Sequence, residues 1–182
     1  EIGHYLDKVK EYEDVLRVQR PTVAESGWMK DILHVSGGKT TDEGAQFESY
    51  MNGYANIARD TLYGGYIESF AKTSNSPVQE ANNNRIAELF ANGLSVVGYF
   101  GHSSANTFEY NLSNPENYHS QGKYPFFNVS GCMAGNLFTF DLQRITGNSM
   151  SLSEKYVLAP QRGSIAFLAD THFGIPYILD TY

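Results

Sequence analysis

The sequence has one cysteine, no long hydrophobic run and no cluster of basic residues. The single cysteine, Cys132, excludes an internal disulfide and any metal site made of several cysteines. No window approaches the roughly eighteen consecutive apolar residues of a membrane span, so none is expected in this chain. The 13 Lys and Arg residues form no run and the formal net charge is -7. Nucleic acid is therefore not expected as a partner, because neutralising phosphates requires a basic surface.

The length and composition predict one domain with a substantial core. The chain has 182 residues, of which 41% are hydrophobic. Ile2, Tyr5 and Val9 begin a helical spacing that Pro21 stops, so residues 1–20 are expected to form a lead-in helix and residues 21–182 the main domain. Because the sequence opens at Glu1 and ends in an apolar stretch, we expect an excerpt of a longer precursor.

Strand and helix patterns alternate along the main domain. Strands are expected at 31–38, 64–72, 94–100, 125–131 and 162–170, and helices at 42–60, 82–93 and 151–159. The third, fourth and fifth strands are nearly continuous apolar runs, as expected of strands buried in a sheet. This alternation predicts an α/β fold with a mostly parallel sheet and helices on both faces.

Two central strands end in reactive side chains. His102 follows the strand at 94–100, and Cys132 follows the strand at 125–131. In a parallel sheet both would lie on the same rim, where ligands bind, and their spacing permits adjacent strands. A thiolate attacks amide carbonyls and a nearby imidazole protonates the departing amine, so the pair suits acyl transfer. The alternative for a lone cysteine or histidine is inert packing, which is more frequent for an arbitrary strand-end cysteine.

The neighbours of this pair suggest further roles. Gly101 and Gly131 are small residues that would keep the rim open to an extended substrate, and the main-chain N–H groups of Ser103 and Cys132 are candidates to stabilise an oxyanion. Asp170 and His172 end the last strand on the same rim, where they either line the substrate cleft or are solvated.

Other signals are weaker. The sequence SGGKTT follows a strand and precedes a helix, but it lacks the first glycine of a phosphate-binding loop, so an ordinary turn is the better interpretation. Four histidines are scattered without the close helical spacing of a zinc site, namely His4, His34, His119 and His172. We predict no metal and no cofactor.

The stretches SVVGYFGHSS, PFFNVSGCMAGNLF and SLSEKYVLAPQRGSIAFLADT resemble blocks of the gingipain family of cysteine peptidases, peptidase family C25. YLDKVKEYE and WMKDILHVSGG resemble the start of that domain in PorU-type sortases of the type IX secretion system. The resemblance implies a caspase-like three-layer α/β/α sandwich with a mostly parallel central sheet over residues 21–182. It matches His102 to the family's catalytic histidine and Cys132 to its nucleophile.

Some family features are altered. The usual His-Gly pair is His102-Ser103, and the glutamate that orients the histidine in gingipains aligns with Gly37 or Gly38. The acidic residue that selects arginine in some gingipains falls near Gly44, beside Asp42, Glu43 and Glu48, so preference for basic residues is not expected.

The sequence thus predicts a cysteine endopeptidase or a sortase-like transpeptidase acting on polypeptide substrates. The alternative is a catalytically inactive pseudoprotease that binds peptides or partners in type IX secretion. The resemblance also implies export to a bacterial surface and possible contacts with secretion-system components.

Overall fold

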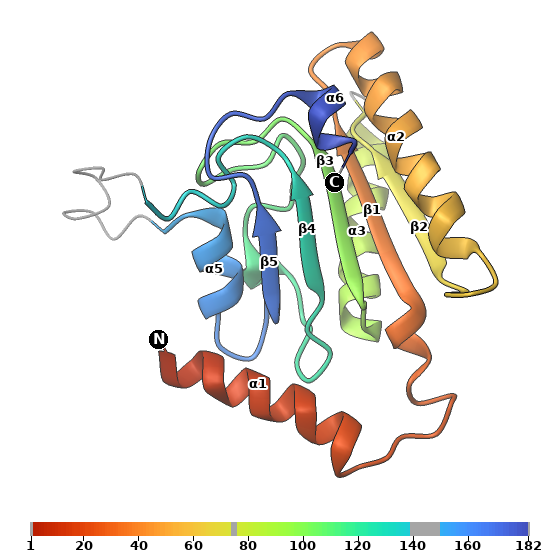
Figure 1. The fold of residues 1–182 in the computed structure, drawn as a ribbon, viewed down its shortest axis with the longest axis vertical. Helices are drawn as coiled ribbons and strands as arrows, with labels where there is room; N and C mark the ends of the chain where they lie inside the picture. The colour runs from red at the N-terminus through yellow and green to blue at the C-terminus, as the bar shows by residue number, and fades with distance from the viewer. Residues whose placement is uncertain (1, 74–75, 139–149, 182) are drawn as a thin grey trace.

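The computed structural model describes residues 2–73, 76–138 and 150–181. Its centre is a sheet of five parallel strands in the order β2-β1-β3-β4-β5 (Figure 1). The strands are β1 (Asp31–Gly37), β2 (Tyr66–Ala71), β3 (Val96–Gly101), β4 (Phe126–Ser130) and β5 (Ala166–Ala169). All five carboxyl ends therefore lie along one edge, as the alternation of strands and helices predicted.

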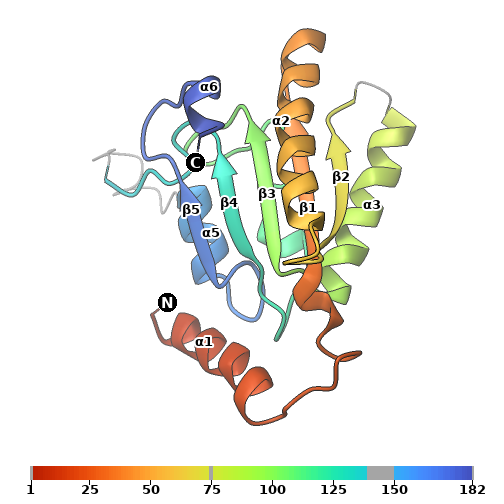
Figure 2. The same cartoon turned by 45° about the vertical axis from the view of Figure 1, so that its right-hand side comes forward.

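Helices cover both faces of this sheet. The helices are α1 (Ile2–Arg17), α2 (Thr41–Arg59), α3 (Ser76–Asn92), α5 (Leu152–Leu158) and α6 (Pro176–Leu179), with 3-10 turns at η1 (Gly27–Lys30) and η2 (Pro115–Asn117). Of these, α1 lies past the amino ends of the strands (Figure 1). Figure 2 shows α2 in front of the strands and α5 behind them. The expected three-layer, caspase-like α/β/α architecture is confirmed.

Alternation along the strands assigns side chains to the two faces. Leu33, Val35 and Tyr99 pack with Ile86 and Phe90 of α3 in the larger core. The residues between them face α2, and they pack in two smaller clusters. One cluster contains Phe47, Met51, Phe100 and Leu179. The other contains Ile32, Ala55 and Ile67. Alternate residues of the strands thus face opposite sides of the sheet, and the apolar faces of the helices cover them, which gives three layers.

The central helix α2 is well specified at its start. The Thr40 hydroxyl accepts from the Glu43 N–H, and the Glu43 carboxylate reaches back to the Thr40 N–H, which forms a capping box. Asp42 and Glu43 lie in the first turn and Arg59 in the last, where the helix dipole favours each charge. The start of α2 is therefore fixed at the carboxyl edge of the sheet.

The prediction that the fourth and fifth strands are fully buried was wrong. Asn128 in β4 is exposed, and Leu168 in β5 is 58% exposed. Both lie on the face that α2 covers elsewhere, and the main contacts of α2 with the sheet are with β1, β2 and β3. The apolar residues of β4 and β5 are therefore buried on one face of the sheet, and the other face of these strands is exposed.

The lead-in helix was predicted for residues 1–20, and α1 ends slightly earlier, at Arg17. It is anchored by Lys8, whose side chain is 1% exposed. The Lys8 amine donates to the main-chain carbonyls of Tyr156, Arg162 and Ser164 at 3.2, 3.0 and 3.0 Å. Burial lowers the pKa of Lys8 to about 8.

This burial predicts a pH-dependent stability. Because the pKa of Lys8 is lower in the folded protein than in the unfolded chain, folding releases a proton between about pH 8 and 10.5, and stability rises with pH in that window. From pH 7.5 to 9.5 we expect the free energy of unfolding of the wild type to rise by about 1–2 kcal/mol relative to Lys8→Met.

Urea unfolding at several pH values measures this difference. Lys10→Met, at an exposed position of the same helix, is the matched control and should follow the wild type. A difference between wild type and Lys8→Met that does not change with pH would contradict the prediction.

Candidate active site

The sheet places His102 and Cys132 at equivalent positions on neighbouring strands. β3 pairs with β4 in parallel, and the last pair in the register is Phe100 with Ser130. His102 and Cys132 each lie two residues beyond that pair, so both leave the sheet at its carboxyl edge. The His102 side chain is 31% exposed and Cys132 is half-buried, so both are open to solvent.

Main-chain contacts on both sides hold His102. Its N–H donates to the Gly37 carbonyl at 3.2 Å, which ties it to the end of β1. Its carbonyl accepts from the Tyr99 hydroxyl at 2.6 Å and from the Glu109 N–H at 2.9 Å. Tyr99 is buried, and that burial raises its pKa well above the ordinary value, so the hydroxyl stays a donor. The backbone of His102 is therefore rigidly placed.

Glu43, from the first turn of α2, orients the imidazole. Its Oε2 lies 3.2 Å from His102 Nε2, and the Phe47 ring packs edge-on against the imidazole with centroids 5.8 Å apart. A carboxylate only accepts, so Nε2 is assigned the proton and Nδ1 is left for proton transfer. The hydrogen bond from His102, followed by the main-chain bond from Lys39, lowers the pKa of Glu43. The carboxylate is therefore ionised at neutral pH.

The same carboxylate occupies the main-chain donors of the SGGKTT segment. Glu43 Oε2 also accepts from the N–H groups of Lys39 and Thr40, at 3.1 and 3.3 Å. These are donors that a phosphate would use at the start of a helix. Because a side chain of α2 already accepts from them, the interpretation as an ordinary strand-to-helix turn agrees with the structure.

Cys132 lies in a turn that contacts the segment after β5. The Gly174 N–H points to the sulfur at 3.4 Å, and the Gly174 carbonyl lies 3.8 Å from it. Among the described residues, no hydrogen bond joins the sulfur to His102. Met133, the next residue, has φ +59, a left-handed conformation that is unfavourable for a residue with a Cβ. Such backbone strain is common at functional sites.

The two proposed oxyanion donors are available. Within the described part of the chain, no hydrogen bond is found for the main-chain N–H of Ser103 or of Cys132. The Ser103 hydroxyl instead donates to the Cys132 carbonyl at 2.7 Å, which links the two strand ends directly.

Gly101 and Gly131 are both buried, which favours a packing role over the open rim expected from the sequence. A Cβ on Gly101 would lie 2.5 Å from the Gly37 carbonyl oxygen. A Cβ on Gly131 would lie 2.5 Å from Ser103 Oγ and 3.0 Å from the Gly101 carbonyl oxygen. These glycines let the strand ends approach closely, and a direct contact with substrate stays a prediction.

Asp170 and His172 follow β5 at the same edge. Their carbonyls accept from the N–H groups of Gly135 and Met133, at 2.9 and 2.8 Å, so their main chains support the turn after Cys132. Asp170 Oδ2 is buried without a partner among the described residues, and burial raises the pKa of this carboxyl. The His172 side chain is exposed.

A pocket of about 370 Å³ adjoins the Cys132 turn. Gly174, which contacts the sulfur, also forms part of its wall. The remaining wall is mainly apolar, with Leu168, Phe173, Ile175 and Ile178 exposed around it. This pocket lies on the face of β4 and β5 that α2 leaves uncovered.

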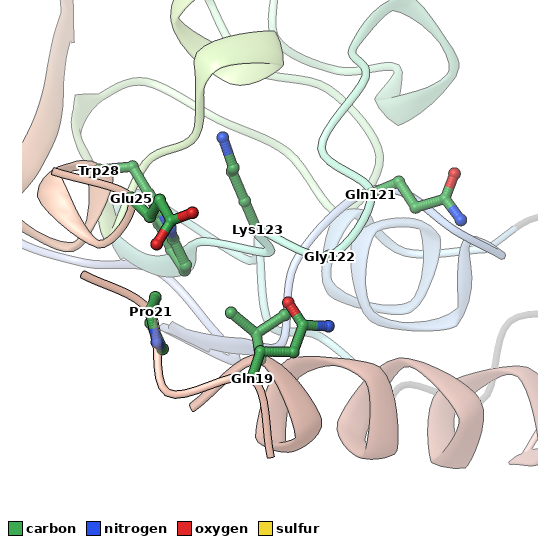
Figure 3. Close-up of a pocket in the computed structure, with 8 residues that line it drawn as sticks. Gln19, Pro21, Glu25, Trp28, Gln121, Gly122 and Lys123 are labelled. Carbon is green, nitrogen blue, oxygen red and sulfur yellow. The ribbon is translucent and has the colours of Figure 1, made fainter. Parts of the chain in front are cut away.

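A second pocket, of about 410 Å³, is lined by other parts of the chain. Its walls are Val15, Gln19, Pro21, Glu25, Trp28, Gln121, Gly122 and Lys123. Figure 3 shows these side chains around the hollow between the end of α1 and the turn at 121–123. The Lys123 amine donates to the carbonyl of Asn92, the last residue of α3. None of the proposed reactive residues lines this pocket.

The scattered histidines do not assemble. Among the described residues, no group of three or more His, Cys, Asp or Glu side chains is placed to hold a metal. His34 is buried under α2, and burial lowers its pKa to about 4, so it is a neutral core residue. No helix of the described residues has the length and apolar character needed to cross a bilayer.

Sequence reasoning missed the role of Glu43. The family resemblance placed the orienting glutamate at Gly37 or Gly38, whereas the structure brings Glu43 to His102 from 59 positions earlier in the chain. The pattern Thr40-x-x-Glu43 was a visible signal, because a capping box places a carboxylate at the helix start, beyond the end of β1.

A parallel five-stranded sheet between two layers of helices places this chain in the caspase-like class of α/β folds. A model of peptidase family C25 matches residues 1–182, and the chain belongs to that family. No curated protein matches the sequence significantly.

Two solved structures share the fold. The Arg-specific cysteine proteinase gingipain R (RGPB) aligns with a TM-score of 0.60 and 22% identity, over 84% of this chain and 34% of that chain. The complex of pro- and mature domains of RgpB from Porphyromonas gingivalis aligns with a TM-score of 0.61 and 18% identity, over 85% of this chain and 35% of that one. This chain therefore spans about a third of the length of those proteins.

The close packing of the strand ends predicts a coupling between Gly131 and Ser103. Gly131→Ala should lower the free energy of unfolding by about 1–3 kcal/mol, because its Cβ would overlap Ser103 Oγ. In a Ser103→Gly background the overlapping atom is gone, so the same change should cost less. A double-mutant cycle by urea unfolding measures this coupling. An equal cost in both backgrounds would show that the two positions do not interact.

Proposed function

We propose that this protein is a cysteine endopeptidase or a sortase-like transpeptidase in which Cys132 is the nucleophile and His102 the acid/base. The observation that carries the proposal is the pairing of β3 with β4, which brings both residues to the same edge, each two residues beyond the last strand pair. Membership of peptidase family C25 supports the same chemistry.

The reaction follows from the groups present. The Cys132 thiol gives its proton to His102 Nδ1, and the resulting thiolate attacks a peptide carbonyl carbon. The carbonyl oxygen becomes an oxyanion near the N–H groups of Ser103 and Cys132. The C–N bond then breaks, and the His102 imidazolium gives its Nδ1 proton to the departing amine. The product is a thioester on Cys132. Attack by water releases an acid, as in a protease, whereas attack by another amine forms a new amide, as in a sortase.

Glu43 acts in this scheme as a positioning residue. Its hydrogen bond to His102 Nε2 fixes the tautomer and points Nδ1 away from α2, and its charge stabilises the imidazolium that forms during the reaction. Since Glu43 is held by main-chain donors at the start of α2, its carboxylate needs little rearrangement to do so.

The residues around Cys132 indicate which substrate side chains would fit. Gingipain R is described as Arg-specific. In this chain the pocket beside Gly174 is mainly apolar, and Asp170 Oδ2 is buried against Gly174, where an added Cβ would come within 3.0 Å of it. These features favour polypeptide substrates with an apolar side chain near the cleaved bond. Asp170 and His172 remain candidates to line that binding site.

The second candidate is a catalytically inactive pseudoprotease that binds peptides or components of a type IX secretion system. It is favoured by the lack of a hydrogen bond between Cys132 and His102 among the described residues, and by Ser103 in place of the usual glycine. In either case we propose a location at or beyond a bacterial cell surface.

The proposal predicts covalent labelling of the site. A peptidyl acyloxymethyl ketone should modify the wild type at Cys132, should not modify Cys132→Ala, and should modify His102→Ala at least about a hundredfold more slowly, because acid/base help is lost. Mass spectrometry locates the adduct. Probes that carry leucine or arginine before the reactive ketone would rank apolar against basic substrates. Equal labelling of wild type and His102→Ala would favour the pseudoprotease.

Glu43→Gln separates orientation from capping. A glutamine can still accept from main-chain N–H groups, so the thermal midpoint should change little, whereas loss of the carboxylate charge should reduce kcat by about tenfold or more. Peptide cleavage and thermal unfolding are measured on the same preparation.

The control for Glu43→Gln is Asp42→Asn, which removes an exposed charge from the same helical turn. It should leave kcat unchanged. If both variants lower kcat equally, the general charge near the helix start matters and the specific bond to His102 does not.

A further inference from the structure

The peptide group between Cys132 and Met133 is held at both of its polar atoms. Its carbonyl accepts from the Ser103 hydroxyl at 2.7 Å, and its N–H donates to the His172 carbonyl at 2.8 Å. Ser103 follows β3 and His172 follows β5, the two strands that flank β4. The peptide group that follows the thiol-bearing residue is therefore fixed from both sides of its own strand.

This arrangement accounts for the conformation of Met133. With φ +59, Met133 is in the left-handed region, which an isolated residue with a Cβ avoids. Rotation of the preceding peptide group would let φ return to negative values, but it would break both hydrogen bonds. The two hydrogen bonds to this partly buried peptide group thus hold Met133 at a positive φ, which its side chain disfavours.

We infer that Ser103 is a positioning residue for the Cys132 thiol. Its hydroxyl holds the Cys132–Met133 peptide group and the left-handed turn that follows. The inference rests on the proposed function, in which Cys132 is the nucleophile. It assigns the Ser103 side chain a role separate from that of its N–H group. Without these two bonds ψ of Cys132 and φ of Met133 could change, so the turn that carries the thiol would no longer be fixed relative to β3 and β5.

Gly131 fits the same arrangement. Ser103 Oγ occupies the space where a Cβ of residue 131 would lie, at 2.5 Å. Any larger residue at position 131 would therefore displace this hydroxyl or the backbone beside it. Ser103 and Gly131 are therefore complementary in size across the ends of β3 and β4.

The test compares Ser103→Ala with Ser103→Thr. The alanine variant should lower kcat for a peptide substrate by about tenfold with little change in KM, because the lost hydrogen bond positions the nucleophile and does not bind substrate. Threonine keeps the hydroxyl and should restore most of the rate. Ser120→Ala is the control, since it also removes a hydroxyl bonded to a distant carbonyl, that of Gly163 at 3.2 Å.

Alkylation of Cys132 by iodoacetamide provides a readout that does not require peptidase activity. The rate should fall in Ser103→Ala and recover in Ser103→Thr. If the wild type cleaves no peptide, the proposed function fails while this arm still decides the role of Ser103. Alkylation of Ser103→Ala at the wild-type rate, or the same loss in Ser120→Ala, would overturn the inference.

Met133 gives a second measurement that does not depend on the Ser103 variants folding. Met133→Gly and Met133→Ala remove the same side chain beyond Cβ, but only glycine accepts φ +59 without penalty. The glycine variant should therefore melt several degrees above the alanine variant. Equal melting temperatures would overturn the inference that this turn is held against its preference.

Discussion

The parallel pairing of β3 with β4 is the constraint on which the site depends. Hydrogen bonds between these strands fix the register through Phe100 and Ser130, so the next residues of both chains leave the sheet together. His102 and Cys132 therefore lie at one edge, although no hydrogen bond joins their side chains in the described part of the chain. A shift of one residue in either strand would turn one of the two side chains to the opposite face.

One carboxylate couples the folding of α2 to the chemistry of the site. Glu43 completes the capping box at the start of the helix and also accepts from His102. Because the helix start provides the donors that hold this carboxylate, a stable α2 and an oriented imidazole form together. Phe47, one turn along the same helix, packs against both Phe100 and the His102 ring.

The contacts beyond the end of β4 differ from those beyond the end of β3. Around His102 the main chain is tied to β1 and the side chain to α2. Around Cys132 the contacts come from Ser103, His172 and Gly174, and the neighbouring face of β4 and β5 is apolar and open. The candidate site thus combines a rigidly held His102 with a strained turn after Cys132, beside an apolar pocket.

The sequence by itself determined the order of strands and helices, the parallel sheet and the positions of His102 and Cys132 at strand ends, because these depend on local periodicity and on the chirality of strand connections. It did not determine that β4 and β5 have an open face, since an apolar run does not say which helix will cover it. Only the tertiary structure decided that Glu43 meets His102 and that Ser103 holds the Cys132 turn. Those contacts join residues far apart in the chain, and their geometry is fixed by helix placement and by close approach of the backbone at Gly101 and Gly131.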